Sequence, residues 1–436
     1  MKSDRKIVSW ALYDWANSAF ATTVMAGFFP VFFKEYWSAG ADASVSTFHL
    51  GAANSLSSVI VAALTPILGA IADRGNSRKR FLFFFTVLGI FMTGCLFHVG
   101  KGNWELAAGI YVVASIGFFC GCMFYDSLIV NVADDPRLDC VSALGYAYGY
   151  LGGGLLFALN VAMTLSPGTF GLAGPGEAVR LSFVSVAVWW AVFSVPIFVF
   201  VKEPRQAVTP SVVQAVREGF KQLGASVARI RSFRVVILFL LGYWLYIDAT
   251  STIIRMAVDY GLSLGFSSRS LVLALLITQF VAFPCAIAFG KIGERIGAKN
   301  GIFICIGVYF LITLWGYFME NEIEFYVLAV LIATVQGGIQ SLSRSLFARI
   351  IPKSQSGEFF GFYNMLGKFA AVIGPVLMGW ASLVTGSPRI SILTVGILFL
   401  GGAAVLTFVD EAEGRRLVER LEDNEQQAPQ PVLPTR

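Results

Sequence analysis

The stretch Gly69-Ala-Ile-Ala-Asp73-Arg74-Gly75-Asn-Ser-Arg78-Lys79-Arg80 places five charged residues between two long apolar runs. The runs on either side cover residues 47–71 and 81–99. Each is long enough to cross a hydrocarbon core of about 30 Å, which takes about 20 residues of α-helix. The stretch therefore predicts two membrane-spanning helices joined by a short charged loop.

The same alternation of apolar run and charged loop continues along the chain. Of its 436 residues, 56% are hydrophobic and 14% are charged, whereas an ordinary soluble domain carries about 25% charged residues. A water-soluble globular protein is therefore excluded. Twelve apolar runs cover residues 7–33, 47–71, 81–99, 104–132, 141–165, 179–201, 235–256, 271–289, 301–319, 325–342, 359–384 and 390–409. We expect an all-α polytopic membrane protein with twelve transmembrane helices in two six-helix bundles.

The longest polar stretch, residues 202–234, separates the sixth run from the seventh. Within it, apolar residues such as Val216 and Phe220 recur at helical spacing beside Arg217 and Lys221. This pattern favours an amphipathic helix on the membrane surface. The chain is expected to divide into an N-terminal bundle (1–201), a cytoplasmic linker (202–234), a C-terminal bundle (235–409) and a cytoplasmic tail (410–436).

Lysine and arginine are distributed unevenly between the two sides of the predicted bundle. Of the 32 such residues, 25 lie on the side of the N-terminus and 5 on the other side, while Arg255 and Lys368 lie inside apolar runs. Because cytoplasmic loops carry the excess of positive charge, both termini are expected in the cytoplasm. The net charge of +5 reflects this topology, and we expect no nucleic-acid partner.

Features of the first half of the sequence recur in the second. The loop after the eighth run reads Gly290-Lys-Ile-Gly-Glu294-Arg295-Ile-Gly297, which repeats the acid–arginine pair 221 residues after Asp73. The first run carries Trp10-x3-Asp14 and the seventh carries Trp244-x3-Asp248, an offset of 234 residues. Repetition of a six-helix unit is typical of secondary transporters, whose site lies between the halves.

The loop from Gly69 to Arg80 resembles the loop signature of the major facilitator superfamily. Within that superfamily, three motifs resemble the vacuole-effluxer-like branch: Trp10-Ala-Leu-Tyr-Asp14-Trp-Ala-Asn17-Ser18-Ala-Phe, Gly145-x3-Gly149-Tyr-Leu-Gly152-Gly153 and Gly337-Gly-Ile-Gln340-Ser-Leu-Ser-Arg344-Ser-Leu-Phe-Ala-Arg349. The resemblance implies a transporter fold, amino acids or similar metabolites as substrates, and the cytoplasmic (inner) membrane of a bacterium. At Asp126 the sequence departs from the branch pattern, which has an amide there.

Three acidic residues inside apolar runs are candidates for proton coupling, because a charge at bilayer depth costs about 2.5–3.5 kcal/mol. They are Asp14, Asp126 and Asp248. Asp14 lies one helical turn from Trp10, so an aspartate reaching interfacial water is the alternative. Asp248 shares a helix face with Arg255 and Asp259, so a buried salt network is the alternative there. For Asp126 the alternative is hydrogen bonding to hydroxyls such as that of its neighbour at position 127.

Polar residues within the apolar runs are candidates for substrate binding. Lys368 can hold a substrate carboxylate, and we expect it to border one cavity together with Asp248. Gln336 and Gln340 lie one helical turn apart, where amides either bind a polar ligand or join helices. In the fifth run, tyrosines that could line a cavity alternate with glycines that favour close helix packing. The full set of candidates is Asn17, Thr22, Tyr146, Gln336, Gln340, Asn364 and Lys368.

The charged loops are expected to form a cytoplasmic gate. The resemblance implies that such a loop joins the two halves while the cytoplasmic side is closed and separates when that side opens. The gate residues are expected to be Gly69, Asp73, Arg74, Glu294 and Arg295.

Together these features predict a secondary active transporter that moves a small polar solute by alternating access, driven by protons as a symporter or antiporter and working as a monomer in the lipid bilayer. A lipid-moving protein is the alternative, followed by a membrane-embedded enzyme. The sequence lacks the phosphate-binding pattern Gly-x4-Gly-Lys-Ser/Thr, and its two histidines, His49 and His98, lie near the ends of runs. We therefore expect no catalytic residues, no metal site and no cofactor.

Overall fold

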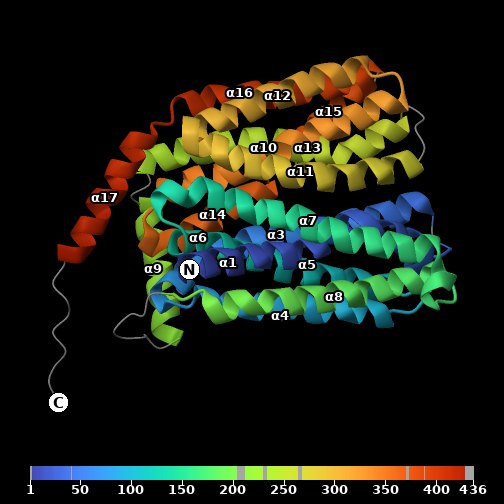
Figure 1. Ribbon diagram of the computed structural model, residues 1–436, viewed down its shortest axis with the longest axis horizontal. Helices are drawn as coiled ribbons and strands as arrows, with labels where there is room; N and C mark the ends of the chain where they lie inside the picture. The colour runs from blue at the N-terminus through green and yellow to red at the C-terminus, as the bar shows by residue number, and fades with distance from the viewer. Residues whose placement is uncertain are drawn as a thin grey trace.

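The structure is a bundle of long helices lying side by side along one axis (Figure 1). This computed structural model describes residues 2–40, 42–203, 212–228, 233–263, 268–369, 373–386 and 388–427. Within these ranges the regular secondary structure is helical throughout. We refer to α1 through α8 as the first half and to α10 through α16 as the second half.

The first half contains α1 (Lys2–Ala19), α2 (Phe29–Phe32), α3 (Ala43–Gly75), α4 (Arg78–Cys95), α5 (Trp104–Ser127), α6 (Ile129–Val132), α7 (Leu138–Leu165) and α8 (Pro175–Phe200). The second half contains α10 (Arg234–Ser263), α11 (Ser268–Ile296), α12 (Ala298–Phe318), α13 (Glu322–Arg349), α14 (Ser356–Phe369), α15 (Ile373–Thr385) and α16 (Pro388–Thr407). Two more helices are α9 (Val212–Ala228), between the halves, and α17 (Glu411–Gln427), after them.

Eleven helical spans in the described part of the chain are long and apolar enough to cross a membrane. The first of them continues from α1 through a π-helical stretch, Phe20–Phe28, into α2 and a further π-helical turn. The described parts of the predicted eleventh run, residues 359–384, belong to α14 and α15. These helices account for the twelve predicted runs, six in each half.

The tenth run is longer than the sequence pattern suggested. We predicted that it ends at residue 342, but α13 continues to Arg349. Arg344 is 1% exposed and Arg349 is 7% exposed, and each pairs with an aspartate of the first half. Because these arginines have buried partners, they lie within the bundle and not in a loop.

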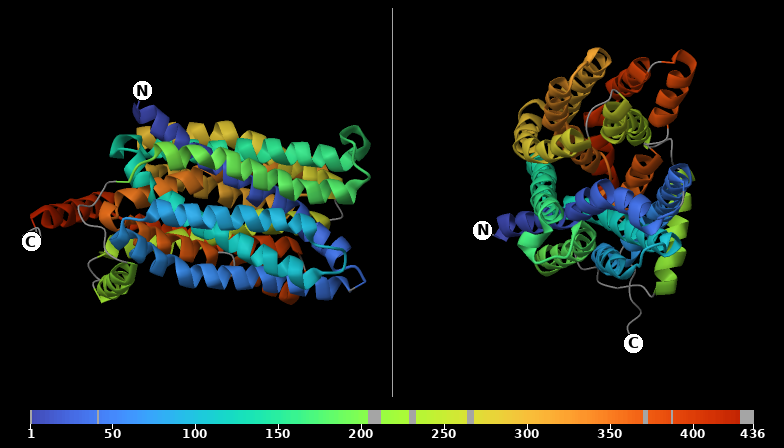
Figure 2. Two further views of the ribbon diagram at one scale, coloured as in Figure 1. Left: turned by 90° about the horizontal axis from the view of Figure 1, so that it is seen from below. Right: turned by 90° about the vertical axis from the view of Figure 1, so that its right-hand side faces the viewer.

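The first described helix, α1, begins and the last, α17, lies at the same end of the bundle, which we call the terminal end. Figure 1 shows the N-terminus, α9 and α17 gathered there, with α9 running across the helix bundle. The end-on view in Figure 2 shows the first half, in blue to green, on one side and the second half, in yellow to red, on the other.

The two halves meet through two matching helix pairs: α3 packs against α14, and α7 packs against α11. Each pair joins the second helix of one half to the fifth helix of the other. Small residues allow the close approach: a Cβ atom added at Gly69 or Gly361 would overlap the backbone of the facing helix. On the other side, Gly290 of α11 lies against α7. The interface therefore has approximate two-fold symmetry.

The predicted linker helix is present as α9. It packs against α3, where Gly219 lies close to Ile71. The Gln222 amide donates a hydrogen bond of 2.5 Å to the Glu358 carboxylate at the start of α14. Thus α9 contacts both halves at the terminal end.

Candidate functional site

A cavity of about 480 Å³ lies between the two halves. The first half lines it from the first transmembrane span, α5 and α7, and the second half from α10, α11, α13 and α14. All seven substrate-binding candidates line this cavity: Asn17, Thr22, Tyr146, Gln336, Gln340, Asn364 and Lys368. The structure thus brings together residues that are separated by up to 351 positions in the sequence, while their part in binding remains a prediction.

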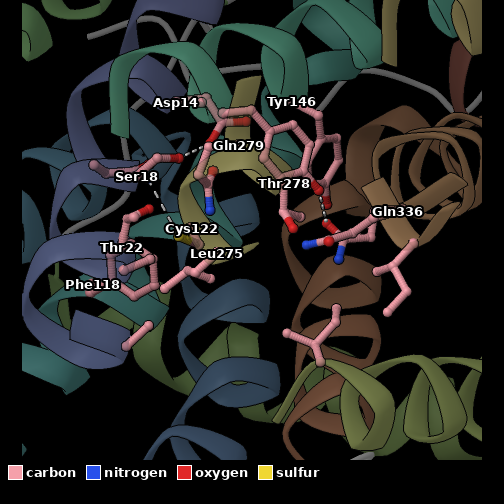
Figure 3. Close-up of a pocket in the computed structure, with 18 of the residues that line it drawn as sticks. Asp14, Ser18, Thr22, Phe118, Cys122, Tyr146, Leu275, Thr278, Gln279 and Gln336 are labelled. Atoms are coloured by element: carbon pink, nitrogen blue, oxygen red, sulfur yellow. Dashed lines mark hydrogen bonds between the residues drawn. The ribbon is translucent and has the colours of Figure 1, made fainter. Parts of the chain in front are cut away.

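The walls of the cavity differ in polarity along its length. In Figure 3, Asp14, Ser18 and Thr22 lie along one wall, while Thr278 and Gln336 lie on the other. Along α13 the lining runs from Phe325 to residue 344, about 28 Å at 1.5 Å per residue. On α13 the lining changes from apolar at Phe325, Leu328 and Ile332 to polar at Gln336, Gln340 and Arg344, towards the terminal end.

Arg344 fills the terminal end of the cavity. Its guanidinium donates hydrogen bonds to the Asp126 carboxylate at 2.8 Å, to the Ser142 hydroxyl at 2.9 Å and to the Ser142 carbonyl at 2.7 Å. Breaking such a buried pair by removing one partner costs about 3–5 kcal/mol, because the other charge is left uncompensated. Arg344 therefore ties α13 firmly to α5 and α7.

Three aromatic rings surround the same guanidinium. Its central carbon lies 4.3 Å from the ring centroid of Tyr146, 4.8 Å from that of Trp10 and 5.4 Å from that of Tyr125. Gly145 makes room for this arrangement, since an added Cβ atom would lie within 3.0 Å of the Tyr125 hydroxyl, the Trp10 ring and the guanidinium. Cation–π attraction is strongest in such desolvated places.

Sequence analysis did not single out Arg344, because it was assigned to a loop beyond the tenth run. A signal was present: Gln336, Gln340 and Arg344 follow one another at four-residue intervals and therefore share a helix face. Continuing the helix by two turns would have placed the arginine on the cavity wall.

Asp126 and Asp14 both line the cavity, but their surroundings differ. Asp126 is paired with the guanidinium described above, and the Asn364 amide donates a further hydrogen bond to it at 3.3 Å. The suggested bond to the Ser127 hydroxyl is absent, because that hydroxyl donates to the carbonyl of residue 124. Asp14 accepts from the Ser18 hydroxyl at 3.3 Å and from the Tyr125 hydroxyl at 3.5 Å. Among the residues that the structure describes, Asp14 has no cation within 4 Å.

The glycines of the fifth run pack closely against the first helix, as predicted. A Cβ atom at Gly149 would meet Ser18 and Asp14, and one at Gly152 would meet Trp15. Close packing of α7 on α1 therefore sets the position of the Asp14 carboxylate.

Lys368 lines the cavity near the end of α14. Its ammonium nitrogen lies 3.0 Å from the ring centroid of Phe119 on α5. This contact joins the two halves on the side of the cavity opposite α7 and α11.

Asp248 does not border the cavity, so the expectation that it shares this space with Lys368 is wrong. Its side chain is 1% exposed and accepts hydrogen bonds from the backbone amides of Ile373 and Gly374, at 3.2 and 3.1 Å, and from the Thr252 hydroxyl at 3.3 Å. Asp248 therefore binds two backbone amides of α15 and a hydroxyl of its own helix. The side chains of residues 255 and 259 lie outside the described part.

Asp73 joins the halves at the terminal end. Its carboxylate accepts from the backbone amides of Gly357 and Glu358, at 3.0 and 2.8 Å, and from Arg78 at 2.7 Å. Arg74, the neighbour expected to act with it, is exposed. The partner of the Asp73 carboxylate is Arg78. The chain turns at Asn76, whose φ of 44° is left-handed, and this turn brings Arg78 back to the carboxylate.

The second predicted loop pair is placed differently from the first. Glu294 and Arg295 are exposed at the end of α11, and in the described part neither forms an ion pair across the halves. The equivalent contact belongs to Asp139 of α7, which binds Arg349 at 2.8 Å and accepts from the Ser345 hydroxyl at 2.5 Å. The repeated loop motif therefore does not produce a repeated ion pair.

Comparisons with known proteins agree with this architecture. A family model described as "Vacuole effluxer Atg22 like" matches residues 38–139 and 131–419. An MFS-type transporter of Bacillus subtilis, YxiO, is 40% identical over 412 residues, covering 92% of this chain and 94% of that protein. Autophagy-related protein 22 of Yarrowia lipolytica is 22% identical, over 85% of this chain and 77% of its own.

Solved structures show the same fold at low sequence identity. The proton:xylose symporter XylE superposes with a TM-score of 0.70 at 15% identity, covering 96% of this chain and 98% of its own. The human organic anion transporter MFSD10 superposes with a TM-score of 0.69 at 14% identity, covering 93% and 99%. The expected fold, twelve helices in two six-helix bundles, is confirmed, and these relatives are transporters and not enzymes.

Proposed function

Since the chain belongs to the vacuole effluxer Atg22-like family of the major facilitator superfamily and is a multi-pass membrane transporter, we propose that it moves an amino acid or a similar small polar metabolite by alternating access, coupled to protons. The observation that carries this proposal is the cavity between the halves. It is large enough for a small metabolite, and its lining includes charges of both signs, Asp14, Asp126, Arg344 and Lys368.

The contacts between the halves support alternating access. The Ser142 hydroxyl donates to the Ser341 carbonyl, and the Ser356 hydroxyl donates to the Ser127 carbonyl. Together with the ion pairs of Arg344 and Arg349, these bonds gather at the terminal end. Rocking of the halves that broke them would open the cavity on that side. We propose that this side is cytoplasmic, because it is the side of α1, to which the sequence pattern assigns 25 of the 32 basic residues.

The cavity suits a zwitterionic solute. The Lys368 ammonium can pair with a carboxylate, while the amides of Gln336 and Gln340 can accept from and donate to a polar group. Because one chain encloses the whole cavity, we propose that the transporter acts as a monomer. The relationship to a Bacillus protein supports the inner membrane of a bacterium as its location.

Asp14 is the proposed coupling acid. It lines the cavity and contacts hydroxyl groups, so a proton can reach it through the same space as the solute. Asp126 is held by Arg344 while the terminal end is closed, and Asp248 lies away from the cavity. A carboxylate that loses and regains a proton as the halves move would link the solute to a proton gradient.

The test uses purified protein in liposomes that contain a pH-sensitive dye. Pools of ¹⁴C-labelled L-amino acids are added one at a time, and accumulation is followed after a pH step. We expect one pool to accumulate with a matching dye signal. Asp14→Asn should still exchange labelled for unlabelled solute but should lose accumulation driven by the pH step, whereas Asp248→Asn should retain both.

Accumulation by Asp14→Asn equal to that of the wild type would remove Asp14 as the coupling acid and leave Asp126 as the next candidate. If none of the pools moves while a fluorescent phospholipid crosses between leaflets in the same liposomes, the lipid-moving alternative is correct and the proposed function is wrong.

A further inference from the structure

Arg344 belongs to the second half, yet the groups that hold its guanidinium belong to the first. These are the Asp126 carboxylate, the Ser142 hydroxyl and carbonyl, and three aromatic rings. We call the ring-and-carboxylate part of this arrangement the aromatic socket, formed by Trp10, Tyr125, Tyr146 and Asp126. A guanidinium on a side chain of α13 is thus the cation that fills a site built by α1, α5 and α7.

Two rings of the socket, Trp10 and Tyr125, are held in place by contacts within the first half. The Trp10 indole donates to the Tyr125 carbonyl at 3.0 Å, and the two rings stack with centroids 4.4 Å apart. On its other side, Tyr125 stacks on Tyr13 at 5.1 Å, and the Tyr13 hydroxyl is bonded to Thr86 at 2.8 Å. Since none of these contacts involves Arg344, the Trp10 and Tyr125 rings keep their positions when α13 moves away.

The charges that line the cavity are divided strictly between the halves. Both lining acids, Asp14 and Asp126, come from the first half, and both lining cations, Arg344 and Lys368, come from the second. When the terminal end opens, the guanidinium leaves with α13. The socket then faces the open side with two carboxylates nearby and no basic residue from its own half among the described lining residues. Carboxylate and aromatic faces together form a strong site for an organic cation.

We propose that the aromatic socket is a cation site used in turn by Arg344 and by a cationic group of the transported solute, an ammonium or a guanidinium. This inference rests on the proposed alternating access. A tethered guanidinium has an effective local concentration in the millimolar range or above, so it excludes free cations while the terminal end is closed. In the open state the solute cation occupies the socket, and the returning Arg344 displaces it towards the opposite end.

The first test needs no transport. Arg344→Ala empties the socket, and its melting temperature is measured with methylguanidinium and with methylurea, which has nearly the same shape but no charge. At ten times its dissociation constant, methylguanidinium should raise the melting temperature by about 2 °C. Methylurea should have no effect. Wild-type protein, and Arg344→Ala combined with Asp126→Asn, should not respond to either compound. Equal shifts with both compounds, or none with methylguanidinium, would overturn the proposal.

The second test uses wild-type protein, so it tests the cation site even if Arg344→Ala does not fold. Methylguanidinium is placed on one side of oriented proteoliposomes during solute exchange. We expect methylguanidinium on the terminal side to inhibit at a concentration at least tenfold lower than methylguanidinium on the opposite side. Methylurea, on either side, should also need at least a tenfold higher concentration. Inhibition without sidedness would contradict the socket. If methylguanidinium stabilises Arg344→Ala as expected but no amino acid is transported, the cation site is supported and the proposed solute class is wrong.

Discussion

A methyl group at position 145 would meet three parts of the site at once. The nearest atoms are the Tyr125 hydroxyl at 2.6 Å, the Trp10 ring at 2.9 Å and the Arg344 guanidinium at 3.0 Å. Two of these groups are fixed by hydrogen bonds and stacking, so the added atom cannot be accommodated by one side chain turning away. The absence of a Cβ atom at Gly145 is therefore a requirement of the Arg344 contact.

Gly145→Ala should lower the free energy of unfolding by about 1–3 kcal/mol, the usual cost of overpacking, and should weaken closure of the terminal end. Both effects follow from displacement of the guanidinium from the Asp126 carboxylate. Thermal unfolding and solute exchange in liposomes would measure them. Gly109→Ala, also in a transmembrane helix but with no atom within 4 Å of the new Cβ, is the matched control. Identical behaviour of the two variants would show that position 145 tolerates the methyl group.

For single residues, the sequence indicated which polar side chains line the cavity but not which charged groups pair with one another. Most of the polar candidates were recognisable because amides and lysine are rare within apolar runs. The partners of the charged side chains could not be predicted from the sequence. Arg344 binds Asp126, which lies 218 positions away, and Asp248 binds backbone amides. Those partners are determined by the rotation and register of helices from different halves.

Among the helices, α3 and α14 form the joint that Asp73 holds. Its carboxylate accepts from two backbone amides at the start of α14 and from Arg78. An asparagine in its place offers one acceptor oxygen and loses the negative charge that the helix N-terminus favours. The joint between the halves should weaken as a result.

Asp73→Asn should shift the population towards the state that is open at the terminal end. Cys122 lines the cavity and reports this change, once the other five cysteines are replaced by alanine. A membrane-impermeant maleimide added to the terminal side should label Cys122 several times faster than in the parent protein. Arg74→Gln, at the exposed neighbouring position, should label at the parent rate. Equal labelling rates in all three proteins would show that Asp73 does not hold this joint.

The helices themselves were predicted in number and order, but the end of the tenth was not. The tenth helix continues to Arg349 because its terminal arginines have buried acidic partners. This difference arises from tertiary contacts, which a run of apolar residues does not encode.

For the whole molecule, the uneven distribution of basic residues predicts the orientation in the membrane. Lys221→Cys on α9 and Gly168→Cys at the opposite end are introduced singly into a protein without other cysteines. In intact cells, an impermeant thiol reagent should label position 168 and not position 221, and in inverted vesicles the result should be reversed. Labelling of position 221 from outside intact cells would reverse the orientation argued from the charge count.

Two ion pairs join the halves in the part of the chain that the structure describes: Arg344 with Asp126 and Arg349 with Asp139. In each the acid comes from the first half of the chain and the arginine from the second. Asp126 and Arg344 lie on the fourth membrane-spanning helix of their halves, so a half paired with a copy of itself would place carboxylate against carboxylate, or guanidinium against guanidinium, at this contact. The two halves have the same arrangement of six helices, but the first half supplies the negative charges of these ion pairs and the second half supplies the positive charges. Assembly during synthesis thus favours the joining of unlike halves of one chain over the pairing of like halves from neighbouring chains.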